Sequence, residues 1–298
     1  MSASVLFDTP GPKARRRILL INVIGILLIA GLLFVVVAGL AAKGQMDPEL
    51  WASLFTSNAW VNFLLPGLLN TLKAAGLGIV LSVTFGLAFG MGLLAQAKAL
   101  RWFSTIIVEF FRAVPVLLMI VFLNILLART GMVNGTDSPF WAVVISLMLY
   151  NGSVIAELVR SGVRNLPKGQ REAGIAIGLT TTQSLRLIEI PQALVAMLPA
   201  LIGQFVVILK DSALGYIIGF TEFLFFSRTF AAANGNMLQA LLLAAAVFII
   251  INFSLGKLAE FVSRRLSSRM PSAKEGANPA TDIEAPITPP VAPIDPKV

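Results

Sequence analysis

Leu166 to Pro191 reads LPKGQREAGIAIGLTTTQSLRLIEIP and is the only long polar segment inside an otherwise apolar chain. Apolar residues recur through it at near-helical spacing, at Ile175, Leu179, Leu185 and Ile188. The segment also carries several arginines and a lysine, so it is too polar to lie in the hydrocarbon of a bilayer. The sequence therefore predicts a charged, helical surface loop that is suited to contact with a partner molecule.

The composition of the chain places it in the membrane class. Of its 298 residues, 57% are hydrophobic and 13% are charged, whereas a soluble domain has about 25% charged residues. The chain has no cysteine and no histidine, which excludes disulfides, thiolate or imidazole metal sites and Ser-His hydrolase sites. Its net charge of +8 does not indicate nucleic-acid binding, because the charges lie in short loops between apolar runs.

The apolar runs predict about six spanning helices. They occupy residues 18–41, 64–94, 103–128, 139–159, 193–209 and 237–258, and about 20 apolar residues suffice to cross a bilayer. Residues 212–236 are apolar but broken by glycines and charges, which predicts a re-entrant or pore-lining segment with a short outer loop. A cleaved signal peptide is the alternative for residues 18–41, but a signal core is usually only about 7–15 residues long.

One of these runs carries a stripe of small residues. Ala74, Gly78, Ser82, Gly86 and Gly90 recur every four residues and so share one face of a helix. Small residues let helix backbones approach closely within a membrane. The stripe predicts helix packing inside a single subunit.

The distribution of lysine and arginine predicts the topology. Sixteen of them lie in loops around residues 13–17, 98–101, 160–186 and 257–274, whereas the opposite loops hold four, at 43, 129, 210 and 228. The positive-inside rule places the richer set, with both termini, in the cytoplasm. The predicted organisation is a basic N-terminus at 1–17, a first spanning helix and outer loop at 18–62, and a membrane domain at 63–262 with a cytoplasmic loop at 160–191. A Pro- and Ala-rich tail at 271–298 is predicted to be disordered.

The polar loop resembles the cytoplasmic EAA loop of ABC-importer permease subunits. The resemblance rests on Glu172-Ala173-Gly174, on Gly178 four residues later, and on Ile188-x-Ile190-Pro191. Gly174 stands where the family has a second alanine, and Ile190 where it has leucine; both keep the small or aliphatic character. Further stretches resemble the polar amino acid branch: Gly67–Leu72, Glu109–Pro115, Ala156–Gly162, Pro167–Glu172, Ile190–Leu194 and Lys210-Asp211-Ser212. The resemblance covers residues 64–262.

The resemblance implies an all-α integral membrane protein with a type I ABC-importer-like transmembrane domain. Its partners would be ATP-binding cassette ATPase subunits, a second permease subunit that is either a paralogue or identical, an extracytoplasmic amino acid-binding protein, and membrane lipid. The expected substrate is a polar amino acid, with glutamate or glutamine favoured. The loop would couple to the ATPase through Gly169, Gln170, Glu172, Ala173, Gly174, Gly178 and Pro191.

The sequence predicts no enzyme activity in this chain. It contains no G-x-x-x-x-G-K-[ST] pattern, since Gly256-Lys257 is followed by leucine. ATP and magnesium are therefore expected on the partner ATPase, and no cofactor or metal is expected on this chain.

Two further groups of residues are candidates for transport. The candidate substrate path comprises Asn70, Thr71, Gln204, Lys210, Asp211 and Ser212; each has the alternative role of a structural pair or of hydrogen bonding between helices. The candidate ion pairs are Glu109 with Arg112 and Glu157 with Arg160, three residues apart on a helix face. A structural ion pair is favoured there over a gate.

Two other functions stay open. A gradient-driven secondary transporter would show an inverted repeat with paired broken helices, and no second copy of the Leu166–Pro191 pattern is evident. A membrane scaffold that only anchors an ATPase would show no transport. The main interpretation also has a variant, in which the chain is an ABC permease for another small polar solute.

Overall fold

The computed structural model describes residues 11–267, and this part of the chain is built from helices, turns and bends without strands. The long helices are α1 (Pro12–Ala42), α4 (Leu65–Leu93), α5 (Lys98–Ala113), α6 (Val116–Thr130), α7 (Ser138–Arg164), α11 (Leu198–Asp211) and α13 (Met237–Ser267). The shorter ones are α2 (Pro48–Ala52), η2 (Ser53–Phe55), α3 (Ser57–Ala59), η3 (Trp60–Leu64), α8 (Lys168–Ala176), α9 (Thr181–Ser184), η4 (Leu185–Glu189), α10 (Ile190–Ala196), η5 (Ser212–Ile218) and α12 (Phe223–Asn234). The predicted tail at 271–298 lies outside the described residues.

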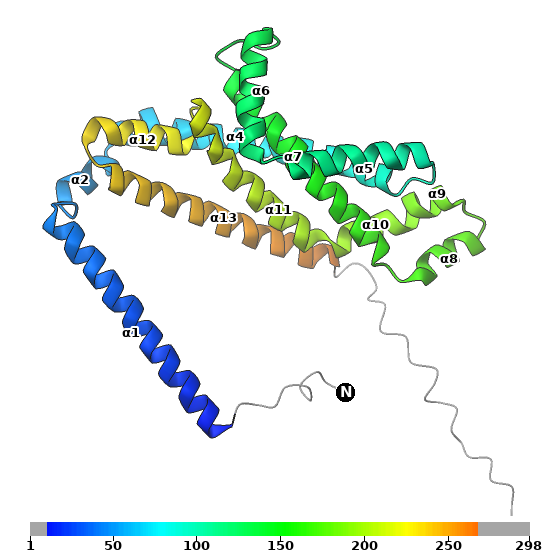
Figure 1. Ribbon diagram of the computed structural model, residues 1–298, viewed down its shortest axis with the longest axis horizontal. Helices are drawn as coiled ribbons and strands as arrows, with labels where there is room; N and C mark the ends of the chain where they lie inside the picture. The colour runs from blue at the N-terminus through cyan, green and yellow to red at the C-terminus, as the bar shows by residue number, and fades with distance from the viewer. Residues whose placement is uncertain (1–10, 268–298) are drawn as a thin grey trace, which may run out of the picture.

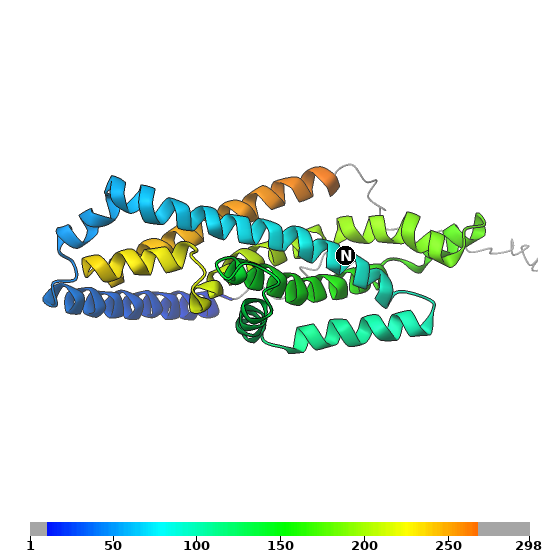
Figure 2. The same cartoon turned by 90° about the horizontal axis from the view of Figure 1, so that it is seen from above.

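Within residues 11–267, five helices are long and apolar enough to cross a membrane, or up to six if the pair α5–α6 counts as one span. These spans confirm the predicted all-α membrane fold. Figures 1 and 2 show α4 and α13 running roughly along the long axis of the molecule, and Figure 1 shows α7 and α11 inclined to it.

The centre of the bundle is the seam between α4 and α7. The predicted small-residue stripe is buried there, and a Cβ atom added to Gly86 would lie 2.4 Å from Cγ2 of Ile155 on α7. A Cβ on Gly90 would lie 2.8 Å from Val159 in the same way. The backbones approach so closely because these positions carry no side chain, which confirms the packing role of the stripe.

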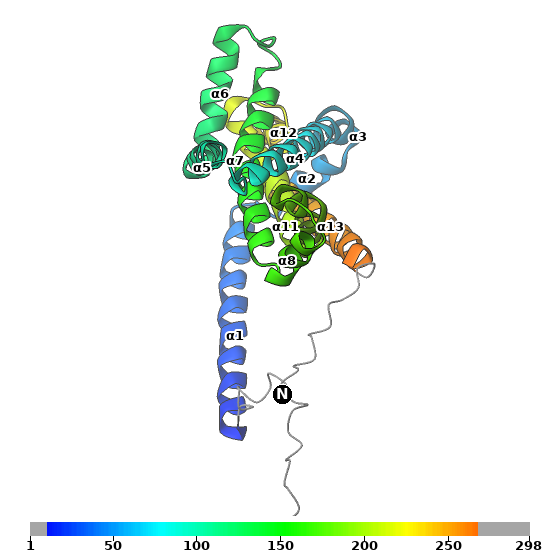
Figure 3. The same cartoon turned by 90° about the vertical axis from the view of Figure 1, so that its right-hand side faces the viewer.

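The predicted third span at residues 103–128 is not one straight helix. The structure bends by 99° between α5 and α6. Pro115 causes the break, because it disfavours helical geometry at the preceding residue, and Val114 accordingly has the extended values φ −82° and ψ 126°. Helix α6 rises away from the bundle in Figures 1 and 3.

The predicted fifth span at residues 193–209 is also displaced. Helix α10 ends at Ala196, and α11 begins at Leu198 with Pro199 in its first turn; the continuous apolar span runs from Leu198 to Ile218. The predicted re-entrant segment at 212–236 folds as η5 followed by α12, and Phe223 of α12 is fully buried.

The loop at residues 43–62 folds onto the bundle. Leu54 and Ala59 are fully buried in a cluster with residues of α12 and α13. Gln239 donates to the backbone oxygen of Gln45 at 2.7 Å, and Asn236 donates to that of Leu50 at 2.9 Å. These contacts fix the end of the bundle at which α1 is attached. Helix α1 then runs away from the bundle (Figures 1 and 3), and its apolar side chains are largely exposed.

Candidate functional site

Helix α8 is the central element of the predicted coupling loop, and glycine terminates it. Gly178 has φ +88°, in the left-handed region. Its N–H donates to the oxygen of Ile175 at 2.9 Å, and the N–H of Leu179 donates to the oxygen of Gly174 at 3.1 Å. This pair of bonds is a Schellman cap, which satisfies the last carbonyl groups of the helix and reverses the chain.

The returning chain packs closely against α8. Gly174 is buried, and a Cβ there would lie 2.7 Å from Oγ of Ser184 and 3.1 Å from Cδ1 of Ile188. Glycine at this position, where the family pattern has alanine, matches that close approach. Ser184 also donates to the buried carboxylate of Glu189 at 3.2 Å.

Two further contacts hold the loop in shape. Thr180 and Gln183 form a capping box at the start of α9, with the Thr180 N–H donating to Oε1 of Gln183 at 2.8 Å. Gln192 of α10 donates to Oε1 of Gln170 on α8 at 3.0 Å. The loop is therefore a folded unit with two helical arms, at the end of the bundle opposite α2 (Figure 1).

The outer surface of α8 combines a carboxylate with apolar groups. Glu172 and Ala173 are exposed, as are Ile175 and, just beyond the helix, Ile177, with 50% and 76% exposure. Among the ion pairs of the described residues, none involves Glu172. Gly169 and Pro191 are also exposed, and nothing lies within 4 Å of a Cβ built on Gly169. The structure thus brings the predicted coupling residues together on one loop.

Asn70 and Thr71 of the candidate substrate path tie α4 to the turn before α12. Asn70 Nδ2 donates to the backbone oxygen of Thr221 at 2.8 Å. The buried hydroxyl of Thr71 accepts from the N–H of Phe223 at 3.0 Å and donates to the oxygen of Gly67 at 3.1 Å. Both side chains therefore have structural partners.

The candidate residues on α11 and at its end differ in whether their side chains have hydrogen-bond partners and in how exposed they are. Gln204 donates to Oδ1 of Asn151 on α7, and the buried Ser212 donates to the oxygen of Leu209 at 2.7 Å. Lys210 is exposed and Asp211 is partly buried. These two neighbours form no ion pair with each other or with another described residue.

Both candidate ion pairs form, on the facing helices α5 and α7. Arg112 Nη1 lies 3.4 Å from Oε1 of Glu109, and Arg160 Nε donates to Oε2 of Glu157 at 2.9 Å. Arg112 also acts electrostatically on Glu157 across the two helices. The four residues therefore form one charge cluster.

Lys73 was missing from the predicted site, and Glu222, with Arg228, was only a weaker candidate for the substrate path. Lys73 is exposed within the span Ser57–Leu93 and has no ion pair with a described residue; an isolated charge in a spanning run was the signal that could have found it. Glu222 is fully buried between the last two spans, and its carboxylate accepts from the N–H groups of Leu224 at 2.8 Å and Phe225 at 2.6 Å. Burial raises the pKa of Glu222 to about 7, although the two backbone donors act in the opposite direction.

Known proteins are similar to this chain in both sequence and fold. Residues 78–268 match the family described as the binding-protein-dependent transport system inner membrane component. The glutamate transport system permease protein GluD of Corynebacterium glutamicum is 45% identical over 227 residues, which cover 76% of this chain and 83% of that protein. The probable glutamine ABC transporter permease protein GlnP of Bacillus subtilis is 34% identical over 210 residues, covering 70% of this chain and 93% of GlnP.

Solved structures agree with the family match. A crystal structure of an amino acid ABC transporter with histidines aligns with a TM-score of 0.63 and 27% identity, over 69% of this chain and 95% of that chain. The inward-facing MetNI methionine ABC transporter aligns with a TM-score of 0.57 at 20% identity, over 70% of this chain and 99% of that chain, and so shows a shared fold. The chain is therefore a multi-pass protein of the cytoplasmic membrane with the fold of an ABC-importer transmembrane domain, and it belongs to the family of binding-protein-dependent transport system inner membrane components.

Proposed function

We propose that the chain is the permease subunit of an ATP-driven importer for a polar amino acid, with glutamate or glutamine favoured. The observation that carries this proposal is the coupling loop. Helix α8 ends in a glycine cap, packs tightly on the chain that follows it, and exposes Glu172 beside apolar groups at one end of the bundle. An exposed apolar surface with a carboxylate suits docking to a cleft on an ATPase subunit that supplies a lysine or arginine.

The proposed assembly contains two permease subunits around a central path, either two copies of this chain or this chain with a paralogue. Two ATPase subunits would hold ATP and magnesium and dock on the α8 loops. An extracytoplasmic binding protein would deliver the substrate at the opposite end. The excess of lysine and arginine around residues 160–186 supports a cytoplasmic position for α8.

The proposed mechanism is alternating access. ATP binding closes the ATPase dimer and draws the two α8 helices together, which opens the path outward. Hydrolysis of ATP and release of its products return the path to the inward-open state. A folded loop transmits such a movement better than a flexible one. Here the hydrogen bond from Gln192 to Gln170 links α8 directly to α10, so a displacement of α8 reaches the bundle.

The substrate class follows from the relatives and is supported by charge. Lys73 on α4 and Lys210 on α11 are exposed in spanning segments without ion pairs among the described residues. A lysine inside a membrane domain is costly unless it faces water, a partner or a ligand. An amino acid with two carboxylates offers such a lysine a counter-charge.

Uptake by cells tests the proposal. Cells lacking the chain and cells carrying it are compared for uptake of labelled glutamate, glutamine, aspartate, arginine, histidine and cystine. We expect uptake of an acidic or amide amino acid only with the chain present, and we expect ATP depletion or vanadate to abolish it. Uptake that survives ATP depletion but fails with an uncoupler would instead establish a gradient-driven transporter. Unchanged uptake across the whole panel would refute the amino acid assignment.

A further inference from the structure

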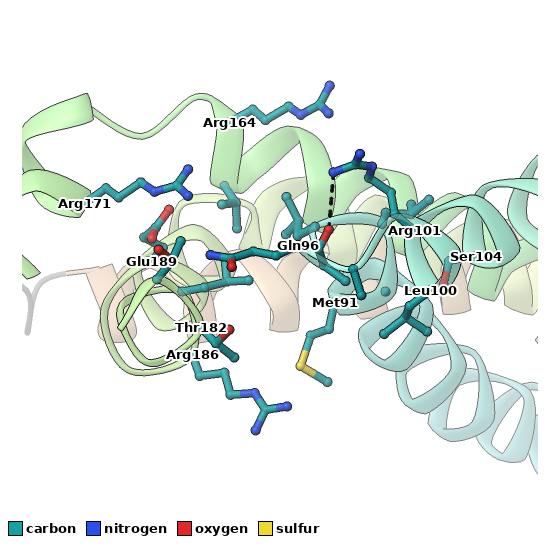
Figure 4. Close-up of a pocket in the computed structure, with 18 of the residues that line it drawn as sticks. Met91, Gln96, Leu100, Arg101, Ser104, Arg164, Arg171, Thr182, Arg186 and Glu189 are labelled. Carbon is teal, nitrogen blue, oxygen red and sulfur yellow. Dashed lines mark hydrogen bonds between the residues drawn. The ribbon is translucent and has the colours of Figure 1, made fainter. Parts of the chain in front are cut away.

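A cavity of about 1070 Å³ lies between the coupling loop and the turn that joins α4 to α5. Its walls come from the last turn of α4, the first turns of α5, the end of α7, and α8 to η4. Figure 4 shows side chains from these elements around it. The transport mechanism proposed above gives this cavity no role.

The cavity is strongly basic. Arg101, Arg164, Lys168, Arg171 and Arg186 line it. None of these five side chains forms an ion pair with a carboxylate in the part of the chain that the structure describes. The carboxylate that lines the cavity, Glu189, is buried and accepts a hydrogen bond from Ser184. The lining of the cavity therefore carries an excess of positive charge.

Two helix N-termini add to this charge. Helices α5 and α8 both begin at the cavity, where Ala97 and Pro167 occupy their N-cap positions. Neither helix has a side-chain cap or an acidic residue in its first turn. The first N–H groups of a helix lack partners within the helix and carry partial positive charge, so both ends favour an anion.

One wall of the cavity is apolar and lies where two candidate membrane spans end. Met91, Leu100 and Phe103 line it and are 39%, 51% and 54% exposed. The spans Ser57–Leu93 and Ser138–Arg164 both end here, and Trp102, 70% exposed, lies beside this wall on α5. Indole side chains favour the headgroup region of a bilayer. An occupant of this cavity therefore meets guanidinium groups on one side and hydrocarbon on the other.

We propose that this cavity binds the headgroup of an anionic phospholipid, with the phosphate among the arginines and the acyl chains along Met91, Leu100 and Phe103. A phosphate group matches the forked donors of arginine. Basic pockets between membrane helices on the cytoplasmic side are suited to anionic headgroups. The lipid would bridge the bundle, through Arg101 and Arg164, to the coupling loop, through Arg171.

The inference rests on the proposed function for the cytoplasmic leaflet and for the ATPase arm of its test. Lipid binding can be measured in detergent without transport. A failure here therefore leaves amino acid import standing, and a failure of the uptake test leaves lipid binding standing.

The test uses the full chain, purified alone and with its ATPase partner in a neutral detergent. Melting temperature is followed while phosphatidylglycerol, phosphatidylcholine or free glycerol phosphate is added. The variant carries Arg101→Gln with Arg164→Gln, and the matched control is Lys98→Gln, which removes a charge from the same turn outside the cavity lining. Gel filtration and the melting temperature before any lipid is added establish that each variant is folded.

We expect phosphatidylglycerol, but not phosphatidylcholine, to raise the melting temperature of the wild-type chain and of Lys98→Gln. The double variant is expected to bind phosphatidylglycerol about 30-fold more weakly, because each basic residue near a lipid surface contributes about a fivefold factor. Equal binding by the double variant, or an equal loss in Lys98→Gln, would overturn the proposal. Saturation by free glycerol phosphate alone would replace the lipid with a soluble anion. Loss of the lipid effect in the ATPase complex would assign the cavity to the ATPase.

Discussion

Replacing Gly178 by alanine should weaken the coupling loop, whereas the same change at Gly169 should strengthen it. Gly178 has φ +88° at the cap of α8, and nothing lies within 4 Å of a Cβ built there. The cost of Gly178→Ala is therefore conformational, and an L-residue in the left-handed region costs about 1–2 kcal/mol. Gly169 is the second residue of α8 and also has open space around its Cβ, so Gly169→Ala stabilises the helix, by less than the gain of about 0.5–1 kcal/mol at a mid-helix position.

Hydrogen exchange measures this difference directly. The N–H of Leu179 is bonded to the oxygen of Gly174, so its exchange reports opening of the cap. We expect Gly178→Ala to raise the exchange rate about 5–30-fold and to lower amino acid uptake, whereas Gly169→Ala slows exchange. Unchanged protection of Leu179 in Gly178→Ala would refute the cap as the element that holds α8. Faster exchange in both variants would show that added bulk, not the dihedral angle, is responsible.

Three other perturbations test separate parts of the molecule. Glu172→Lys reverses the charge on the exposed face of α8 and should cost at least about 2 kcal/mol of ATPase docking, so uptake falls more than tenfold while membrane insertion persists. The same charge reversal at the exposed Asp137, at the start of α7, should leave uptake unchanged. Normal uptake by Glu172→Lys would disprove the docking role. Lys210→Met should raise the KM for uptake about tenfold or more through loss of a charged hydrogen bond, without lowering the melting temperature; an unchanged KM would exclude substrate contact. Glu222 has a pKa raised to about 7 in the folded protein, above its unfolded value, so the stability it contributes is complete below the unfolded pKa and is lost as pH rises through about 7. The free energy of unfolding from melting curves should fall between pH 5.5 and 8 by about 2 kcal/mol more in the wild type than in Glu222→Gln. Identical pH dependence in both proteins would contradict this.

The features that depend on local pattern were predictable from the sequence. The small-residue stripe from Ala74 to Gly90 predicted close helix packing within the subunit, because a four-residue period puts small residues on one helix face. The near-helical spacing of Ile175, Leu179, Leu185 and Ile188 predicted a helical loop, and the structure forms α8 there. Both features arise within one segment of about 20 residues, where spacing determines which side chains share a face.

The features that depend on distant segments were not predictable. Val114-Pro115 signals a break but does not determine its angle of 99°, which also depends on the packing of α5 and α6 against α7. The fifth span likewise begins at Leu198, with Pro199 in its first turn, and runs to Ile218, whereas the sequence predicted residues 193–209. The basic cavity is lined by Arg101, Arg164 and Arg186 from three separate parts of the chain. A pattern within one segment of sequence does not show that such distant residues line the same cavity.

Helix α1 forms a separate thermodynamic unit within the chain. Its candidate span, Lys13–Ala42, has no buried residues, and no described helix packs along its length. Its backbone hydrogen bonds are internal, so its free energy is determined by transfer from water to lipid and not by contacts with the bundle. Substitutions in α1 and substitutions at the α4–α7 seam should therefore change the free energy of folding additively, because the two regions share no contacts through which their effects could couple.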